Sequence, residues 1–132
     1  MPLKKINITR GLVEDKRSRK RGTTKLKRVS ELLNTHQLKA YNIRFEKGAK
    51  SRLHMHDSDQ IIVCVEGKGM LTTFSEINPD DKDNMLKIKD SVDMAEGEAV
   101  LIPAGTLHWH GASKKEVSLQ FSVMRNGMTF WF

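Results

Sequence analysis

Residues 48–67 read GAKSRLHMHDSDQIIVCVEG, and residues 97–112 read GEAVLIPAGTLHWHGA. Each stretch carries a His-x-His pair, His54 with His56 and His108 with His110. Residues i and i+2 of a β-strand project from the same face, so each pair can present two imidazoles to one point. Neutral imidazole is a ligand that suits zinc, copper, iron and nickel. The two stretches together therefore predict a metal site.

Turn residues surround both histidine pairs. Gly48 lies six residues before His54, and Gly67 lies seven residues after Gln60. In the second stretch, Gly97, Pro103, Gly105 and His108 follow one another at spacings of six, two and three residues. Glycine and proline are typical of the positions where a strand turns. One His-x-His pair is a weak signal, but two pairs in such surroundings form a specific one.

The rest of the chain favours short strands. Apolar or alternating runs bounded by turn residues predict strands at residues 41–45, 61–65, 70–74, 99–102 and 117–124. Weaker strands are expected at residues 3–8, 85–88 and 128–132, and residues 29–34 could form one helical turn. No long stretch has an apolar period of 3.6 residues. Many short strands at this spacing predict an all-β sandwich or barrel.

The residues quoted above resemble the cupin superfamily. Its first motif has Gly, His-x-His, Glu and Gly at the spacings of Gly48, His54, His56, Gln60 and Gly67, with Gln60 in place of the glutamate. Its second motif matches Gly97, Pro103, Gly105 and His108, while Ala112 stands where an asparagine is expected. The resemblance spans residues 48–112 and implies a single-domain jelly-roll β-barrel.

A closer resemblance concerns small bacterial single-domain cupins, some of which are manganese-dependent hydroxynitrile lyases. In those proteins three histidines and one glutamine bind the metal. The resemblance implies that His54, His56, Gln60 and His108 bind one divalent transition metal ion (Mn, Fe, Ni or Zn). It also implies that His110 is a second histidine of the pocket. Gln120 stands where this group has a further histidine.

Glutamine at position 60 changes the charge at such a site. Three imidazoles and a carboxylate leave a divalent ion with a net charge of +1, whereas three imidazoles and an amide leave +2. The site should then be the stronger Lewis acid, and it should favour an anionic partner. The alternative is that Gln60 is only a hydrogen-bonded strand residue. His110 is a candidate catalytic acid or base, and a place on the pocket rim is the alternative.

Strand alternation also predicts which side chains face the barrel interior: Tyr41, Ile43, Phe45, Ile62, Cys64, Gln120 and Met124. Most of these residues are expected to be core. Cys64 is expected to be a small buried hydrophobe, because no basic residue adjoins it in sequence. Trp109 should point away from the interior if His108 and His110 point inward.

The net charge of +7 is concentrated at the N-terminus. Residues 1–28 carry a net charge of +9, whereas residues 29–132 carry −2. We therefore expect a basic N-terminal arm over residues 1–25 and a cupin β-barrel domain over residues 26–132. The run from Lys16 to Arg21 leaves nucleic acid as a partner to test, although no aromatic residue interleaves with the charges of residues 1–39. A solvated tail is the plainest alternative. The resemblance implies another, in which the arm exchanges between the subunits of a homodimer.

The composition predicts a cytoplasmic protein without a membrane anchor. The longest apolar run, residues 61–65, is too short to cross a bilayer. No apolar stretch follows the first basic residues, as it would in a secretory signal. Cys64 is the only cysteine, so no intrachain disulfide can form.

Three functions are compatible with these features. The first is a metal-dependent lyase or dioxygenase acting on a small polar organic molecule. The second is a non-catalytic module that binds or senses a metal or a small ligand. The third is a nucleic-acid-associated cupin, through the basic arm.

Overall fold

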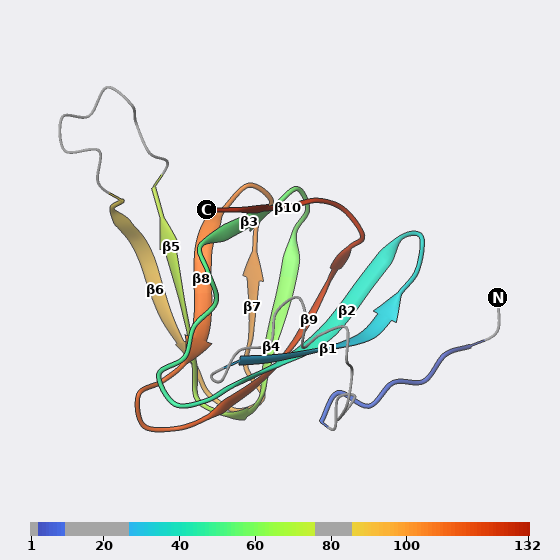
Figure 1. Ribbon diagram of the computed structural model, residues 1–132, viewed down its shortest axis with the longest axis horizontal. Helices are drawn as coiled ribbons and strands as arrows, with labels where there is room; N and C mark the ends of the chain where they lie inside the picture. The colour runs from blue at the N-terminus through green and yellow to red at the C-terminus, as the bar shows by residue number, and fades with distance from the viewer. Residues whose placement is uncertain (1–2, 10–26, 76–85) are drawn as a thin grey trace.

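The computed structural model describes residues 3–9, 27–75 and 86–132. These residues form two antiparallel sheets of five strands that face each other (Figure 1). The first sheet has the order β1-β2-β9-β4-β7, with bounds Lys27–Asn34, Leu38–Phe45, Ser118–Arg125, Gln60–Gly67 and Ala99–Ile102. The second has the order β10-β3-β8-β5-β6, with bounds Thr129–Trp131, His54–His56, Leu107–Ala112, Gly69–Phe74 and Ile88–Met94. The expected jelly-roll β-barrel is confirmed.

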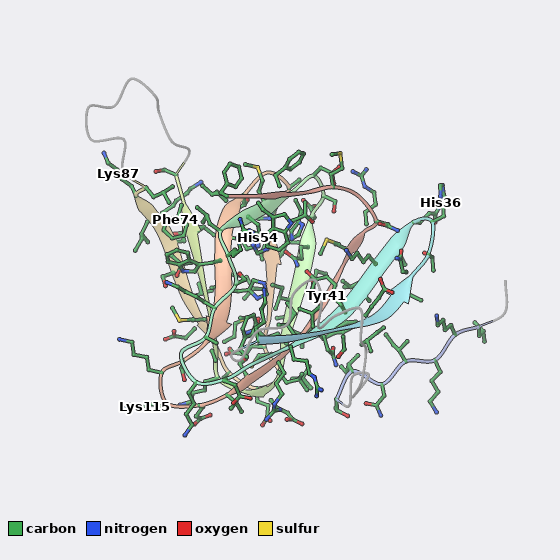
Figure 2. All side chains as sticks on the ribbon, viewed as in Figure 1. His36, Tyr41, His54, Phe74, Lys87 and Lys115 are labelled. Atoms are coloured by element: carbon green, nitrogen blue, oxygen red, sulfur yellow. The ribbon has the colours of Figure 1, made fainter. Side chains whose placement is uncertain are left out.

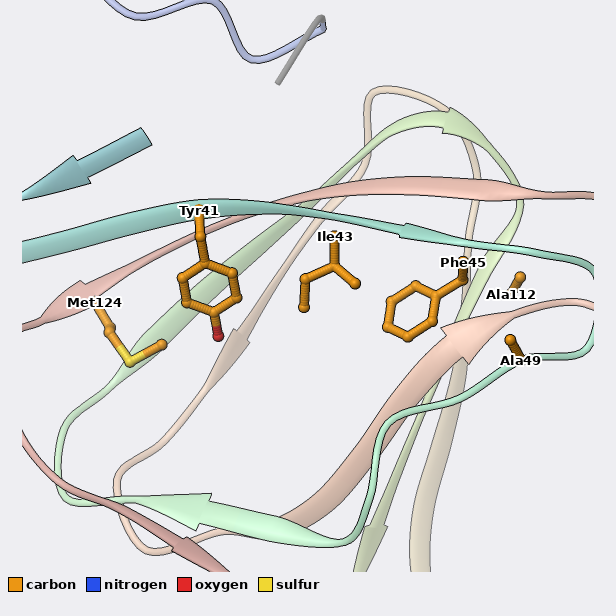
Figure 3. Close-up of a cluster of buried hydrophobic side chains, with 6 residues drawn as sticks. All are labelled: Tyr41, Ile43, Phe45, Ala49, Ala112 and Met124. Atoms are coloured by element: carbon orange, nitrogen blue, oxygen red, sulfur yellow. The ribbon is translucent and has the colours of Figure 1, made fainter. Parts of the chain in front are cut away.

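Two apolar clusters fill the space between the sheets. Figure 3 shows the first cluster, which consists of Tyr41, Ile43, Phe45, Ala49, Ala112 and Met124. The second consists of Ile62, Cys64, Leu71, Met94 and Ile102. All seven side chains that alternation assigned to the interior are buried, Gln120 among them. Trp109 lies on the opposite face of β8, against Phe74 and beneath Lys50.

The four glycines that the sequence places at turns, Gly48, Gly67, Gly97 and Gly105, all have positive φ. At Gly67, which ends β4, φ is +75°, and a Cβ atom would collide with the backbone carbonyl of Val117. Only glycine fits there without strain. The motif spacing therefore reflects backbone geometry as well as ligand placement.

Three expected elements were wrong. Residues 29–34, expected as a helical turn, belong to β1, where pairing with β2 prevails over the helix preference of Glu31 and its neighbours. Residues 3–8, where a strand was expected, are not part of a strand. The weak strand expected at residues 85–88 is β6, which begins only at Ile88 and runs to Met94.

The basic run of residues 16–21 and the proposed boundary after residue 25 lie outside the described residues. So do the loop at residues 78–84 and Met85. Because the described residues contain no helix, none of them forms a helix that could cross a membrane.

Candidate metal centre

Three histidines from two strands meet inside the barrel. His54 and His56 are the two ends of β3, and His108 lies on β8 directly opposite His54. One ring nitrogen from each lies within 4.8 Å of the others, and all three side chains are buried. Figure 2 shows His54 between the two sheets, with His36 far away at the tip of the β1–β2 hairpin. The sequence therefore identified the cluster that the fold assembles.

The Nδ1 atom of each ring already has a partner. His54 Nδ1 donates to the Arg52 carbonyl oxygen at 2.7 Å, and His108 Nδ1 donates to the Thr106 carbonyl oxygen at 2.8 Å. A carbonyl oxygen can only accept, so these two rings carry their hydrogen on Nδ1. His56 Nδ1 lies 2.8 Å from Thr129 Oγ1. Partners of this kind fix the tautomer and orientation of a metal-binding histidine and leave Nε2 free to bind.

Several buried polar atoms of the predicted ligands have no hydrogen-bond partner in the part of the chain that the structure describes. Among the described residues, four buried side-chain atoms make no hydrogen bond: Asn42 Oδ1, His56 Nε2, Gln60 Oε1 and His108 Nε2. The last three belong to ligands that the sequence predicted. An unsatisfied buried polar group costs about 1–3 kcal/mol, a cost that a bound ion would remove for each of these atoms that it reaches. Nitrogen and oxygen atoms of this kind are ligands for divalent transition metals.

Gln60 is held by hydroxyl groups from two other strands. Its Nε2 donates to Ser122 Oγ at 2.7 Å and to Tyr41 Oη at 3.1 Å, which leaves Oε1 as the free end of the amide. Gln60 begins β4, in the sheet that faces the histidines. The sequence treated Tyr41 as core and did not identify Ser122. The alternating polar residues 118, 120 and 122 of a buried strand face were the available signal.

The protein environment keeps the imidazoles neutral. Burial, reinforced by the charges of His108 and His110, lowers the pKa of His54 to about 2. Burial, followed by the charges of His108 and Lys39, lowers the pKa of His56 to about 4. Burial also lowers the pKa of His108, against the opposing effect of the Thr106 carbonyl. Neutral imidazole is the form that binds metal.

His110 stands beside the cluster without joining it. Its ring centroid lies 5.8 Å from that of His54 and 6.1 Å from that of His108, and Phe45 contacts it edge-on. Only 1% of His110 is exposed, so a place on the rim is excluded. Burial lowers its pKa to about 3, although the hydrogen bond with Gln120 raises it. His110 is therefore an interior histidine with a polar partner.

The C-terminal strand β10 contributes two residues that sequence reasoning missed at this site. β10 pairs with β3, which places Thr129 opposite His56 and Trp131 opposite His54. The Trp131 ring lies 4.8 Å from the His54 ring and remains 53% exposed. Arg52 lies over the same indole. No local pattern marks this contact, because the paired strands are separated by most of the barrel domain.

Comparisons with known proteins agree with this architecture. Residues 14–129 match the family described as Cupin. No curated protein matches the chain in sequence. A cupin-like protein from Thermotoga maritima is 23% identical, with a TM-score of 0.66, over 84% of this chain and 82% of that one.

Two further solved structures share the fold. KdgF from Halomonas sp. is 19% identical with a TM-score of 0.62, over 82% of this chain and 87% of that one. An oxalate oxidase in complex with glycolate is 20% identical with a TM-score of 0.63, over 83% of this chain and 57% of that one. At these identities the structural likeness concerns the fold alone.

Proposed function

Because this chain belongs to the cupin family, which hosts many chemistries on one scaffold, we propose its function from the site and not from the fold. We propose a metal-dependent enzyme that acts on a small polar organic molecule, by lyase or dioxygenase chemistry. The observations that support this proposal are the three-histidine cluster, whose ring nitrogens lie within 4.8 Å of one another, and three buried atoms of the proposed ligands, His56 Nε2, His108 Nε2 and Gln60 Oε1. None of these three atoms has a hydrogen-bond partner among the described residues.

The proposed ligands are His54, His56, His108 and Gln60. Three imidazoles and one amide oxygen suit Mn, Fe, Ni or Zn. A divalent ion held by these four neutral ligands would keep its full charge and supply Lewis-acid chemistry to a bound oxygen atom. The chain's own contribution is to hold the ligands in place through Arg52, Thr106, Thr129, Tyr41 and Ser122.

His110 is the residue proposed to handle a proton. It is buried next to His54 and His108, so it can reach a substrate held beside them. The oxalate oxidase neighbour was solved with glycolate, a small polar organic molecule, which makes such a substrate a reasonable starting point here. The resemblance of the motifs to manganese-dependent hydroxynitrile lyases makes a cyanohydrin another substrate to test early.

Metal analysis of protein purified without an affinity tag is the first experiment. We expect close to one equivalent of a divalent transition metal in the wild type and its loss in His54→Ala. His110→Ala should retain the metal and lower turnover by roughly 10²–10⁴, the usual contribution of a positioned acid or base. Loss of metal in His110→Ala would make this residue a ligand and contradict the assignment.

A substrate panel separates the enzyme from the binding module. Metal-dependent turnover of a small hydroxy acid, keto acid or cyanohydrin supports the enzyme. Full metal occupancy and tight ligand binding without turnover would contradict it and leave the non-catalytic cupin module as the function.

A further inference from the structure

Gln120 on β9 has an amide whose orientation is fixed by its surroundings. It is 1% exposed, and its Nε2 donates to the Gly111 carbonyl oxygen at 2.9 Å and to Ser118 Oγ at 3.0 Å. The carbonyl oxygen can only accept, so the NH₂ group must face Gly111. The other end of the amide, Oε1, therefore faces His110 Nδ1, at 2.7 Å.

This contact determines where His110 carries its hydrogen. An amide oxygen can only accept, so Nδ1 must be the donor. A neutral imidazole has one N–H group, which leaves Nε2 with a lone pair and no hydrogen. From the sequence, His110 could have been an acid or a base. With Gln120 in place, its Nε2 is a proton acceptor.

The other groups beside His110 are the rings of His54, His108 and Phe45. His54 and His108 donate from Nδ1 to carbonyl oxygens, so their Nε2 atoms are acceptors, whereas His56 Nδ1 faces a hydroxyl that can donate or accept. Phe45 covers another side of the His110 ring. A ligand held beside the cluster therefore meets His110 as a group that accepts a hydrogen bond.

We propose that Gln120 is a positioning residue that keeps His110 as a hydrogen-bond acceptor, so that the site selects ligands with a hydroxyl donor next to the oxygen bound at the three-histidine cluster. This inference rests on the proposed function for the location of the ligand. A small 2-hydroxy acid fits the requirement, because its carboxylate can approach the cluster while its hydroxyl donates to His110. The same acid without the hydroxyl leaves His110 without a donor.

The tautomer can be measured without any turnover. In protein labelled with ¹⁵N-histidine, long-range proton–nitrogen NMR spectra should show a protonated Nδ1 and an unprotonated Nε2 for His110, both without metal and with diamagnetic Zn(II). Gln120→Met, which has a similar length and no acceptor, should shift the population toward the Nε2–H form. Ser118→Ala is the matched control, because it perturbs the same amide and leaves Oε1 in place.

Ligand selectivity gives the second readout. Zn(II)-loaded wild type should bind lactate about tenfold more tightly than propionate, the value of one good hydrogen bond. The preference should persist in Ser118→Ala and fall toward unity in Gln120→Met, with zinc content unchanged in both variants.

Three results would overturn the inference: an Nε2–H tautomer in the wild type, equal affinity for the two acids, or binding of neither. A protein that discriminates between the acids but shows no turnover would refute the proposed enzyme and leave this inference standing. A protein that holds no metal would refute the metal centre, and the tautomer measured without metal would still test the role of Gln120.

Discussion

Gln60 is attached to the protein through its amide nitrogen, and both of its partners are hydroxyl groups. Hydroxyls can accept as well as donate, so Tyr41 and Ser122 can hold a carboxylate at position 60 as readily as an amide. The fold therefore does not demand glutamine at this position. The difference between glutamine and glutamate is one of charge at the proposed metal.

We expect Gln60→Glu to raise metal affinity, because it adds a negative charge to the proposed ligand set. The measurement is competition with a chelator at fixed pH. Gln37→Glu is the matched control, since Gln37 is exposed in the β1–β2 turn and the substitution changes the net charge equally. Unchanged or weaker affinity in Gln60→Glu would show that Gln60 is not a ligand.

Thr129 is the partner of His56 Nδ1. Removing such a partner typically weakens metal binding by 10–100-fold, and for one hydroxyl we expect about tenfold in Thr129→Val. Thr129→Ser retains the hydroxyl and should restore most of the affinity. The same competition assay decides the point, and equal affinities in the valine and serine variants would remove Thr129 from the site.

Among the elements, the turn between β4 and β5 depends on Gly67, whose φ is positive and whose missing side chain makes room for the Val117 carbonyl. Gly97 has φ of +85° and open space around it. The two glycines therefore differ in crowding and share the backbone strain.

We expect Gly97→Ala to lower the free energy of unfolding by about 1 kcal/mol, the cost of a left-handed backbone for alanine. Gly67→Ala should lower it by at least about 2 kcal/mol more, because overpacking against backbone adds to the same strain. Urea unfolding measures both. Equal losses would mean that β9 can move away from the turn at little cost.

The elements also show what the sequence can predict. The strand expected at residues 99–102 is β7 itself, because β-branched residues, a buried position and Pro103 all favour it. The predicted bounds of β6 were wrong because β6 is a polar edge strand that is exposed along most of its length. Its sequence therefore has no alternation of apolar and polar residues from which the strand could be predicted. The histidine cluster was predicted because strand alternation and motif spacing are local. Thr129 was missed because its contact with His56 spans 73 positions and depends on the pairing of β10 with β3.

At the scale of the whole molecule, buried neutral histidines couple stability to pH. The pKa values of His54, His56 and His110 are lowered to about 2, 4 and 3, from 6.5. Below pH 6.5 the unfolded chain therefore binds protons that the folded protein does not. By linkage, the free energy of unfolding must fall as pH falls, and above that pH these residues contribute no pH dependence.

The metal-free protein should accordingly lose stability between pH 6.5 and about 4. Each such histidine contributes at most about 1.4 kcal/mol per pH unit in this window. Urea unfolding at pH 7.5, 6.5 and 5.5 measures the slope. Zn(II)-loaded protein is the comparison: its unfolded chain takes up the same protons below pH 6.5, so the slope should remain while the whole curve lies higher. A flat profile for the metal-free protein would contradict the burial of neutral imidazoles.

The C-terminal end of the described chain carries exposed aromatic side chains. Phe130, Trp131 and Phe132 follow one another at the C-terminal strand, and each is about half exposed. Exposed aromatic patches are typical of interfaces. We predict a homodimer at micromolar concentration by light scattering.

The double substitution Phe130→Ser and Phe132→Ser should yield monomers. Ile88→Ser, at an exposed apolar position on β6, should leave the dimer intact. A monomeric wild type would contradict this prediction.

Deletion of residues 1–25 in the same light-scattering assay tests whether the basic arm takes part in the dimer. If the arm instead binds nucleic acid, that binding should depend on salt concentration and should disappear with the deletion.

The hydrogen bonds around the histidines also imply an order of events during biosynthesis. The rings of His54 and His108 are oriented by backbone carbonyl groups two residues earlier in the chain. These hydrogen-bond partners are therefore already synthesised when each histidine is added. The partner of His56 is translated 73 codons after His56. A nascent chain would therefore expose every proposed ligand well before one of them acquires its final orientation. A metal ion at the proposed site would therefore meet its fully oriented ligands only after β10 has been synthesised and has paired with β3.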